Sequence, residues 1–579
     1  IVLTRRANGS ASSVELAGFP HHALDSYLPK LVKAGFKVAI CDQLEDPKMT
    51  KSIVKRGVTE LVTPGVSYND KTFDKNNNNF LACVHLTPCN AHGIALLDVS
   101  TGEYLASEGD KNYIGRILQS FSPNEVVIQK RLKQTFIDNF GDKMYITTFD
   151  DWVFTKDFGY EALTTQFSTS SLKGYGIEEM SNAIIAAGGI LHYLKETCHD
   201  KTEHITSISR IDEDKYVWLD KFTINNLELI APSTPNGHSL IDIINKTVTP
   251  QGSRMMKRWI VMPLNNIDSI NERLNIVDLF TKNKELSEKL RGHLKNIGDI
   301  ERIAGKIATK RINPREIIHL KEALITLKQV KNECELIDNE DFSKLIDNID
   351  VCEKTIEIIQ QRIKDDPSSL IEKCGVIRDG YNEELDDLRK LTTSGKDYLQ
   401  NIQKREIERT NIPSLKIGFN NVFGYYIEVT NVHKDKVPQD WVRKQTLVNS
   451  ERYITSELKE LEEKIFSAEG RITTLEQQIY AEVIDSLVEH IKTIQKNSFI
   501  TATIDCLLSF AHIAEENGYT RPEINDSLEL NISEGRHPVI EKQMAAGESF
   551  ITNNIFLDAN SQQIMMITGP NMSGKSALL

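Results

Sequence analysis

The segment that most restricts the possible fold lies at the C-terminal end of the chain and runs Gly569-Pro570-Asn571-Met572-Ser573-Gly574-Lys575-Ser576. It matches G-x-x-x-x-G-K-[ST], the pattern of a phosphate-binding loop. Such a loop needs a strand before it and a helix after it, because its backbone N–H groups surround phosphates at the positive N-terminal end of that helix. The apolar run Ile564-Met565-Met566-Ile567 is the predicted strand. The sequence therefore predicts the beginning of an α/β domain of the phosphate-loop class.

The chemistry of this loop assigns its residues to a nucleotide and a metal ion. Residues 569–574 form the loop around the phosphates, and all of them except Pro570 have a backbone N–H group to donate. Lys575 places its charge on the β- and γ-phosphates, and the Ser576 hydroxyl binds Mg²⁺, so the expected cofactors are ATP and Mg²⁺. A plain glycine turn between a strand and a helix is the alternative. The carboxylate and the water-orienting residue needed for hydrolysis are expected beyond Leu579, and Ile1 lies within an expected strand. We therefore expect a fragment cut at both ends, with no catalytic residue inside it.

Length and composition predict several domains in a reducing compartment. A chain of 579 residues exceeds one hydrophobic core. Its eight cysteines form no C-x-x-C pair, which argues against a disulfide framework and a zinc knuckle. No apolar run reaches membrane-spanning length, so no membrane partner is expected. The net charge of -13, from 69 Lys and Arg against 82 Asp and Glu, means that any contact with nucleic acid must come from a local patch.

The N-terminal part of the chain predicts a first α/β unit. Apolar residues between Gly18 and Gly35 share one helical face, and a strand is expected over Phe36–Cys41. The unit ends near Thr63-Pro64-Gly65, and Asn69–Asn79, with its four successive asparagines, is typical of a linker.

A second α/β unit follows. The segment Phe80–Ser107 alternates as two strands around a turn, Pro123–Ile128 predicts a further strand, and Asn182–Tyr193 predicts an apolar helix that closes the unit. The carboxylates of Asp98 and Glu103 flank the turn. Because no cluster of partner residues accompanies them, we do not expect a nuclease-like site.

After about residue 200 the chain changes to long charged helices, and two of these are expected to pair. Their apolar residues alternate steps of four and three, the spacing of a coiled-coil seam. At 1.5 Å per residue, a helix of forty residues is about 60 Å long, so the pair predicts an arm. We expect the second helix to continue to about Ile494. The seams are Tyr381, Leu385, Leu388, Thr392, Gly395, Leu399 and Ile402, and then Ile454, Leu458, Leu461, Ile465, Ala468, Ile472, Leu475 and Ile479.

A β-type insert, Ile412–Asn449, separates the two helices. Alternating residues on both sides of Asn420-Asn421 predict a hairpin. From Lys396 to Thr455 there are ten basic residues against seven acidic ones, an excess of three in a chain of charge -13. A merely solvated surface would also explain this excess.

Uncharged donors near the basic residues favour contact with the phosphate oxygens of nucleic acid. The candidate DNA-binding residues are Arg443, Lys444, Thr446, Asn449 and Asn420.

The phosphate loop and four other stretches together resemble the MutS family of DNA mismatch-recognition ATPases. The longest of the four is Thr247–Trp259, with the sequence TVTPQGSRMMKRW. The others are Asn226-Leu227-Glu228, Gly535-Arg536-His537-Pro538 and Ala17–Ala23. The resemblance covers nearly the whole chain.

This resemblance implies a multidomain fold that combines α/β domains with long α-helical lever arms. Two N-terminal α/β domains are expected, then a helical core with an inserted β clamp, and then the start of an ABC-type phosphate-loop ATPase domain. The implied domains are a remnant of the mismatch-recognition domain (1–68), an RNase-H-like connector domain (80–195), the core with the first lever helix (200–395), the clamp (396–454), the returning lever helix (455–510) and the N-terminal part of the ATPase domain (511–579).

The resemblance also implies roles for single residues. The family stacks adenine on an aromatic residue upstream of its phosphate loop, and Phe550 occupies that place; a core phenylalanine is the alternative. Ser573 and Ala577 replace a glycine and a threonine of the family's loop, but neither is one of the four fixed positions. The family's Phe-x-Glu wedge lies upstream of Ile1, so no residue here is assigned to it.

The function implied by the resemblance is ATP-dependent binding to mispaired duplex DNA with closure of the clamp, which initiates repair. The full-length protein would be a DNA-dependent ATPase, a homodimer and a partner of a MutL-type repair protein, in the cytoplasm with the nucleoid. A non-catalytic DNA-binding repair scaffold remains an alternative. A long-armed chromosome or break-repair ATPase is a further one, but such proteins carry the loop before the coiled coil rather than after it.

Overall fold

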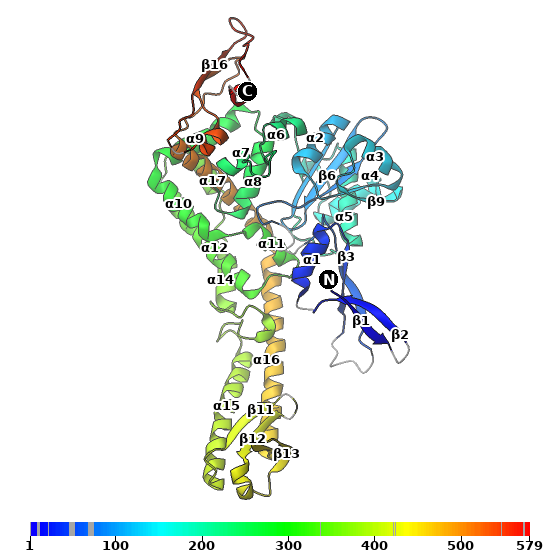
Figure 1. The fold of residues 1–579 in the computed structure, drawn as a ribbon, viewed down its shortest axis with the longest axis vertical. Coiled ribbons are helices and arrows are strands. Elements are labelled where there is room, and N and C mark those ends of the chain that lie inside the picture. The colour runs from blue at the N-terminus through cyan, green and yellow to red at the C-terminus, as the bar shows by residue number, and fades with distance from the viewer. Residues whose placement is uncertain are drawn as a thin grey trace. The chain divides into compact units, whose positions relative to one another are not determined.

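The computed structural model describes residues 2–8, 12–20, 23–45, 53–67, 74–335, 337–420, 422, 424–545, 547–570 and 574–578. The chain forms two compact units, which Figure 1 shows with their elements labelled. Unit 1 comprises residues 1–311, 322–352 and 490–579, and unit 2 comprises residues 312–321 and 353–489.

Unit 1 begins with two antiparallel strand pairs and one helix. The elements are β1 (Val2–Asn8), β2 (Ser12–Gly18), α1 (Leu24–Lys33), β3 (Val38–Gln43) and β4 (Arg56–Val62). Leu28 and Val32 of α1 and Val62 of β4 form a small buried cluster. The helix and strand predicted from Gly18 to Cys41 are confirmed. His21 and His22 of the stretch Ala17–Ala23, and residues 69–73 of the predicted linker, lie outside the described residues.

The second part of unit 1 is a six-stranded sheet in the order β10-β7-β6-β5-β8-β9. Its strands are β5 (Phe80–His85), β6 (His92–Asp98), β7 (Glu103–Gly109), β8 (Glu125–Gln129), β9 (Tyr145–Phe149) and β10 (Ser209–Arg210). The helices around it are α2 (Lys111–Phe121), α3 (Lys133–Phe140), α4 (Lys156–Gln166) and α5 (Ser181–Glu196).

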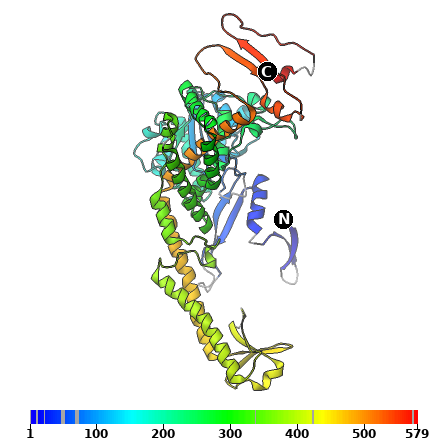
Figure 2. The same ribbon diagram turned by 90° about the vertical axis from the view of Figure 1, so that its left-hand side faces the viewer.

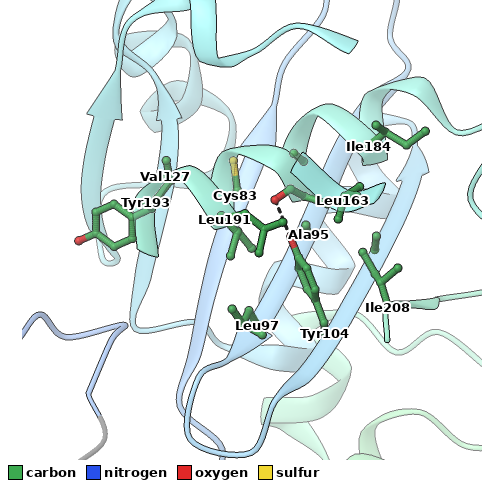
Figure 3. Packing of buried hydrophobic residues seen from close by; sticks show 14 of the residues in the cluster. Cys83, Ala95, Leu97, Tyr104, Val127, Leu163, Ile184, Leu191, Tyr193 and Ile208 are labelled. Carbon is green, nitrogen blue, oxygen red and sulfur yellow. Dashed lines mark hydrogen bonds between the residues drawn. The ribbon is translucent and has the colours of Figure 1, made fainter. Parts of the chain in front are cut away.

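The alternation of side chains along β5 explains why both faces of this sheet are covered. Leu81 and Cys83 belong to the cluster formed with α5, whereas Phe80, Ala82 and Val84 belong to the cluster formed with α2. Figure 3 shows the α5 side, where the Tyr104 hydroxyl donates to the carbonyl of Ala187 at 2.5 Å. A strand buried on both faces is expected for a central position in such a sheet.

The segment Phe80–Ser107 contains three strands, so the prediction of two was wrong. A turn at residues 86–91 separates β5 from β6, and the Thr87 hydroxyl closes it by donating to the carbonyl of Ala91 at 3.0 Å. Asn90 lies in this turn with φ 54°, a conformation that Asn tolerates better than most residues. The predicted strand at Pro123–Ile128 and the predicted helix at Asn182–Tyr193 are confirmed as β8 and α5.

The remaining helices of unit 1 form a helical region in which α7 to α11 pack against α17 (Ile491–Asn517). They are α6 (Lys221–Asn226), α7 (Leu240–Ile244), α8 (Pro250–Val261), α9 (Ile267–Lys282), α10 (Lys284–Ile297), α11 (Ile300–Ala308), α13 (Glu340–Asp347) and part of α12 (Pro314–Cys334). Buried residues lie on all sides of α17, as expected for a helix surrounded by others.

The C-terminal part of unit 1 carries the phosphate loop. Its elements are β15 (Leu530–Gly535), α18 (Pro538–Gln543), β16 (Asn553–Leu557) and α19 (Lys575–Leu578). The strand predicted at Ile564–Ile567 is not formed: β15 and β16 pair with each other, and no described strand pairs with this segment. Ile564 and Met566 of this run are 83% and 84% exposed, so one side of it faces solvent. A strand needs a neighbour for its backbone hydrogen bonds, so the prediction was wrong here.

Unit 2 is a helical arm with a small sheet. It contains α14 (Glu353–Arg362), α15 (Glu383–Thr410), α16 (Ser456–Val488), β11 (Lys416–Asn420), β12 (Gly424–Thr430), β13 (Val442–Thr446) and β14 (Ser450–Ile454). The helices α15 and α16 are paired along their length, as Figure 2 shows. The sheet has the order β11-β12-β14-β13.

The paired helices and the hairpin were predicted correctly. Leu385, Leu399 and Ile402 of the first seam are buried, and so are Leu458 and Ile465 of the second. The hairpin is β11 with β12. The prediction that the second helix continues to Ile494 was wrong, because α16 ends at Val488 and α17 begins at Ile491. The apolar pattern changes there from one seam to burial on all sides.

Candidate nucleotide and nucleic-acid sites

The described part of the phosphate loop ends where α19 begins. Gly574 has φ 83°, in the left-handed region that favours glycine, and the N–H of Leu578 donates to its carbonyl at 3.2 Å. The ammonium of Lys575 donates to the carbonyl of Pro570 at 3.0 Å and also to that of Gly569. The Lys575 charge therefore lies against the loop itself. Asn571, Met572 and Ser573, and the side chain of Ser576, are outside the described residues.

Phe550 lines a cavity of about 540 Å³ that also contains Leu578 of α19. Two of the short stretches that suggested a family resemblance meet in the same cavity, namely 226–228 and 535–538. Phe550 is half-buried, so its ring is neither fully packed in a core nor fully in solvent. Its role as a platform for adenine stays a prediction.

The stretch Gly535-Arg536-His537-Pro538 forms the beginning of α18. Pro538 occupies the first turn, and the Nδ1 atom of His537 accepts from the N–H groups of Val539 and Ile540, both at 3.3 Å. The Arg536 guanidinium donates to the carbonyl of Asn517 at 2.9 Å. The stretch thus fastens the C-terminal part of unit 1 to the end of α17, a role that the sequence pattern did not reveal.

The stretch Thr247–Trp259 forms α8 and its N-terminal cap. The Thr249 hydroxyl accepts from the N–H of Gly252 at 3.1 Å, and Pro250 is the first helical residue. The Asp505 carboxylate of α17 accepts from the Thr249 N–H at 2.7 Å and from its hydroxyl at 2.6 Å. A Cβ atom on Gly252 would lie 2.3 Å from Asp505 Oδ2, which explains the glycine. Burial raises the pKa of Asp505, although these hydrogen bonds oppose the rise.

In unit 2, most candidate DNA-binding residues gather on β13 and the turn that follows it. The pairing of β13 with β14 is irregular between Arg443 and Gln445, so Lys444 is the extra residue of a bulge. Lys444, Thr446 and Asn449 are exposed. Arg443 is 62% exposed and contacts Glu451 at 3.3 Å. This edge of the sheet therefore presents two cations and two uncharged polar groups.

Asn420 does not belong to this group. It ends β11, the opposite edge strand of the sheet, and its Oδ1 atom accepts from the N–H of Val422 at 2.7 Å. The structure therefore separates Asn420 from the other four candidates.

The ion pairs of unit 2 divide its basic residues into two kinds. Arg405 and Arg409 pair with Glu457 and Asp440, and Arg452 lies between Glu428 and the ring of Tyr426. In contrast, Lys416, Lys434 and Lys444 are exposed and form no ion pair with the described residues of the chain. Sequence reasoning did not select Lys416 or Lys434, because only the structure shows which cations are neutralised.

Three protein-family models match most of the chain as far as residue 511. Family models described as MutS domain I, MutS domain II and MutS domain III match residues 1–71, 79–206 and 222–511. The chain belongs to the MutS family. The resemblance inferred from the sequence motifs is thereby confirmed.

Relatives of the MutS family align over the full chain. Proteins named DNA mismatch repair protein MutS from Bacteroides thetaiotaomicron and Bacteroides fragilis are each 53% identical over 579 residues, which is 100% of the chain and 67% of each relative. A protein of the same name from Cytophaga hutchinsonii is also 53% identical, with 68% of its length covered. The chain thus spans about two thirds of the length of these MutS relatives. Among the residues that the structure describes, no helix is long and apolar enough to cross a membrane.

Proposed function

We propose that the full-length protein recognises mispaired duplex DNA and initiates its repair, with ATP binding and DNA-dependent hydrolysis controlling the closure of the clamp. The observation that carries this proposal is the 53% identity over the whole chain to relatives named DNA mismatch repair protein MutS. All four fixed positions of the phosphate loop are present in addition. The domain boundaries implied by the family resemblance are part of this proposal.

The residues of the loop fit a nucleotide with Mg²⁺. The Lys575 ammonium lies against the loop carbonyls of Gly569 and Pro570, where it could exchange these neutral acceptors for phosphate oxygens. Ser576 would supply the hydroxyl for Mg²⁺, and Phe550 would stack on the adenine ring. When bound, Mg²⁺ neutralises charge that develops on the phosphates. We assign the activation of water to none of these residues.

The test of nucleotide binding is a titration of the full-length protein with ATP and Mg²⁺. We expect Lys575→Ala to weaken affinity by roughly 10- to 100-fold, because a hydrogen bond from a charged donor contributes about 1.5–3 kcal/mol. Lys542→Ala is the matched control, since this lysine of α18 pairs with Glu516 on the surface and lies outside the loop. Equal affinity in both variants would contradict the assignment of the loop.

DNA binding is proposed for the β13 edge of unit 2. Arg443, Lys444, Thr446 and Asn449 offer donors for phosphate oxygens, which position a protein on duplex DNA without distinguishing its sequence. Asn420 would contribute separately from the β11 edge. Mismatch recognition itself would come from the family's wedge, to which we assign no residue.

The proposed partners follow from the same function. We expect a homodimer that contacts a MutL-type repair protein and acts in the cytoplasm on nucleoid DNA. A non-catalytic repair scaffold would also bind DNA, but it would not hydrolyse ATP. The rate of ATP hydrolysis by the full-length protein, with and without duplex DNA, therefore separates the two functions.

A further inference from the structure

The segment Asp74–Asn79 follows the first α/β part of unit 1 and leads into β5. It has no apolar side chain, and its four successive asparagines gave no reason to expect a fixed position. Its last two residues are nevertheless held by the second α/β part. The N–H of Asn79 and the side chain of Asn78 both donate to Asp98 Oδ2 at 3.0 Å.

The preceding residues of this segment are held by the helical core instead. Arg254 of α8 donates to the carbonyl of Lys75 at 2.6 Å. Arg302 of α11 donates to the carbonyl of Asn77 at 2.9 Å, and Lys257 of α8 donates to the Asn77 side chain. Three cations from two core helices therefore converge on acceptors of residues 75–77.

Arg254 is fixed in place before it reaches the segment. It is 2% exposed, and its guanidinium contacts Asp299 at 2.8 Å and Glu301 at 2.5 Å. The Asp299 side chain also caps α11 by accepting from the N–H of Arg302 at 3.3 Å. The Asp299 carboxylate therefore holds the guanidinium of Arg254 and the backbone at Arg302. The guanidinium groups of both arginines donate to the segment.

Lys257 and Arg302 have fewer partners. Arg302 is 5% exposed and Lys257 is half-buried, so their charges are largely removed from water. Burial lowers the pKa of Lys257, although the nearby carboxylates of Asp74 and Asp242 oppose this. A buried cation that loses its hydrogen-bond acceptor destabilises the fold. If the segment moved away, the side chains of Lys257 and Arg302 would lose acceptors.

The same helix also contacts the second α/β part directly, because Arg258 of α8 forms an ion pair with Glu103 of β7. One face of α8 therefore holds both the joining segment and the sheet that follows it. The acceptors on the segment are two carbonyls and one amide, all neutral. Each of these hydrogen bonds has an ionised donor, so it is stronger than a bond between two neutral groups.

We propose that Arg254, Lys257 and Arg302 form a clasp on residues 75–77, and that this clasp positions the mismatch-recognition domain relative to the core. They are positioning residues, which act through the joining segment and not by touching DNA. The inference rests on the proposed function, since it assigns the first α/β part to mismatch recognition. It gives the stretch Thr247–Trp259 a role in communication between domains as well as in packing.

The test uses the full-length protein with Lys257→Met and Arg302→Met together, which keep the aliphatic parts of both side chains. Hydrogen exchange is measured on the amides of residues 74–79, and affinity is measured for mismatched and matched duplexes. In the double variant, amide hydrogen exchange of residues 74–79 should accelerate roughly tenfold or more, as expected for the loss of two hydrogen bonds from charged donors. Preference for the mismatch should fall, while affinity for the matched duplex stays within about twofold. Arg273→Met is the matched control, because Arg273 stacks on Trp259 at 3.5 Å.

Unchanged amide exchange would overturn the clasp, and faster exchange with unchanged mismatch preference would overturn its role in positioning the mismatch-recognition domain. If the double variant does not fold, Asn77→Ala removes the acceptor of Lys257 from the segment side and should shift both readouts in the same direction. Asn77→Ala with wild-type exchange and preference would also overturn it. A wild-type protein without mismatch preference would contradict the proposed function, whereas the exchange measurement would still decide whether the clasp exists.

Discussion

Replacement of Gly424 by alanine should weaken the attachment of the sheet of unit 2 to its helical arm. Gly424 begins β12 with φ 77°, and a Cβ atom there would lie 2.0 Å from both carboxylate oxygens of Glu462 in α16. That carboxylate accepts from the N–H of Tyr425 at 3.0 Å. The left-handed conformation costs a non-glycine residue about 1–2 kcal/mol. Loss of the hydrogen bond to the charged acceptor adds about 1.5–3 kcal/mol.

Alanine also lowers the conformational entropy of the unfolded chain relative to glycine, which offsets about 0.4–1 kcal/mol of this cost. We therefore expect Gly424→Ala to lower the free energy of unfolding of unit 2 by about 2–4 kcal/mol, from the terms above. Gly470→Ala is the control within the same unit. Gly470 is an exposed residue inside α16 with nothing within 4 Å of an added Cβ atom, so alanine should stabilise the helix by about 1 kcal/mol.

Trp441 makes the assay specific for this unit. It is the one tryptophan within residues 312–321 and 353–489, and it is buried beside Tyr453. Urea unfolding is followed by Trp441 fluorescence in a chain whose other three tryptophans are phenylalanine. Equal shifts of the midpoint for the two alanine variants would refute the contact between Gly424 and Glu462.

Three further predictions follow from single sites. Phe550→Ala should weaken the binding of adenine nucleotides by about 1–3 kcal/mol in a titration, by analogy with base stacking on aromatic residues. Unchanged affinity would make Phe550 a packing residue. Arg443→Ala with Lys444→Ala should weaken binding to matched and mismatched duplexes equally. The slope of log affinity against log salt concentration should fall by roughly one for each phosphate that is no longer bound. An unchanged slope would indicate a solvated face. Burial lowers the pKa of His204 to about 4. A histidine in the unfolded chain has a pKa of about 6.5. The contribution of neutral His204 to the free energy of unfolding, about 3 kcal/mol, should therefore be present above that pKa and be lost as the pH falls toward 4. His204→Leu should flatten this part of the pH dependence of thermal unfolding, and an unchanged slope would assign it to other groups.

Elements whose partners lie nearby in the chain were predictable from periodicity. The seam of α15 and α16 follows from steps of four and three, and the β11–β12 hairpin follows from alternation around Asn420-Asn421. The strand at Ile564–Ile567 could not be judged in this way, since a strand exists only with a neighbour and none is described there. The break at 489–490 was also missed, because apolar residues continue across it while their surroundings change.

The candidate sites show the same limit. The phosphate loop is recognisable because its chemistry needs fixed residues at fixed spacing. In unit 2, the charge count selects a segment but does not distinguish Arg452, which is neutralised by Glu428, from the exposed Lys444. The three cations on residues 75–77 come from positions about 180 and 225 residues further along the chain, so no local pattern could connect them.

Mismatch discrimination under nucleotide control tests the account most directly. Affinities of the full-length protein for a mismatched duplex and its matched counterpart are compared with and without ATP and Mg²⁺, for the wild type and for Lys575→Ala. The account predicts that the wild type prefers the mismatch and changes this preference when ATP is added, whereas Lys575→Ala keeps the preference but does not respond to ATP. Equal affinity of the wild type for both duplexes under every nucleotide condition would contradict it.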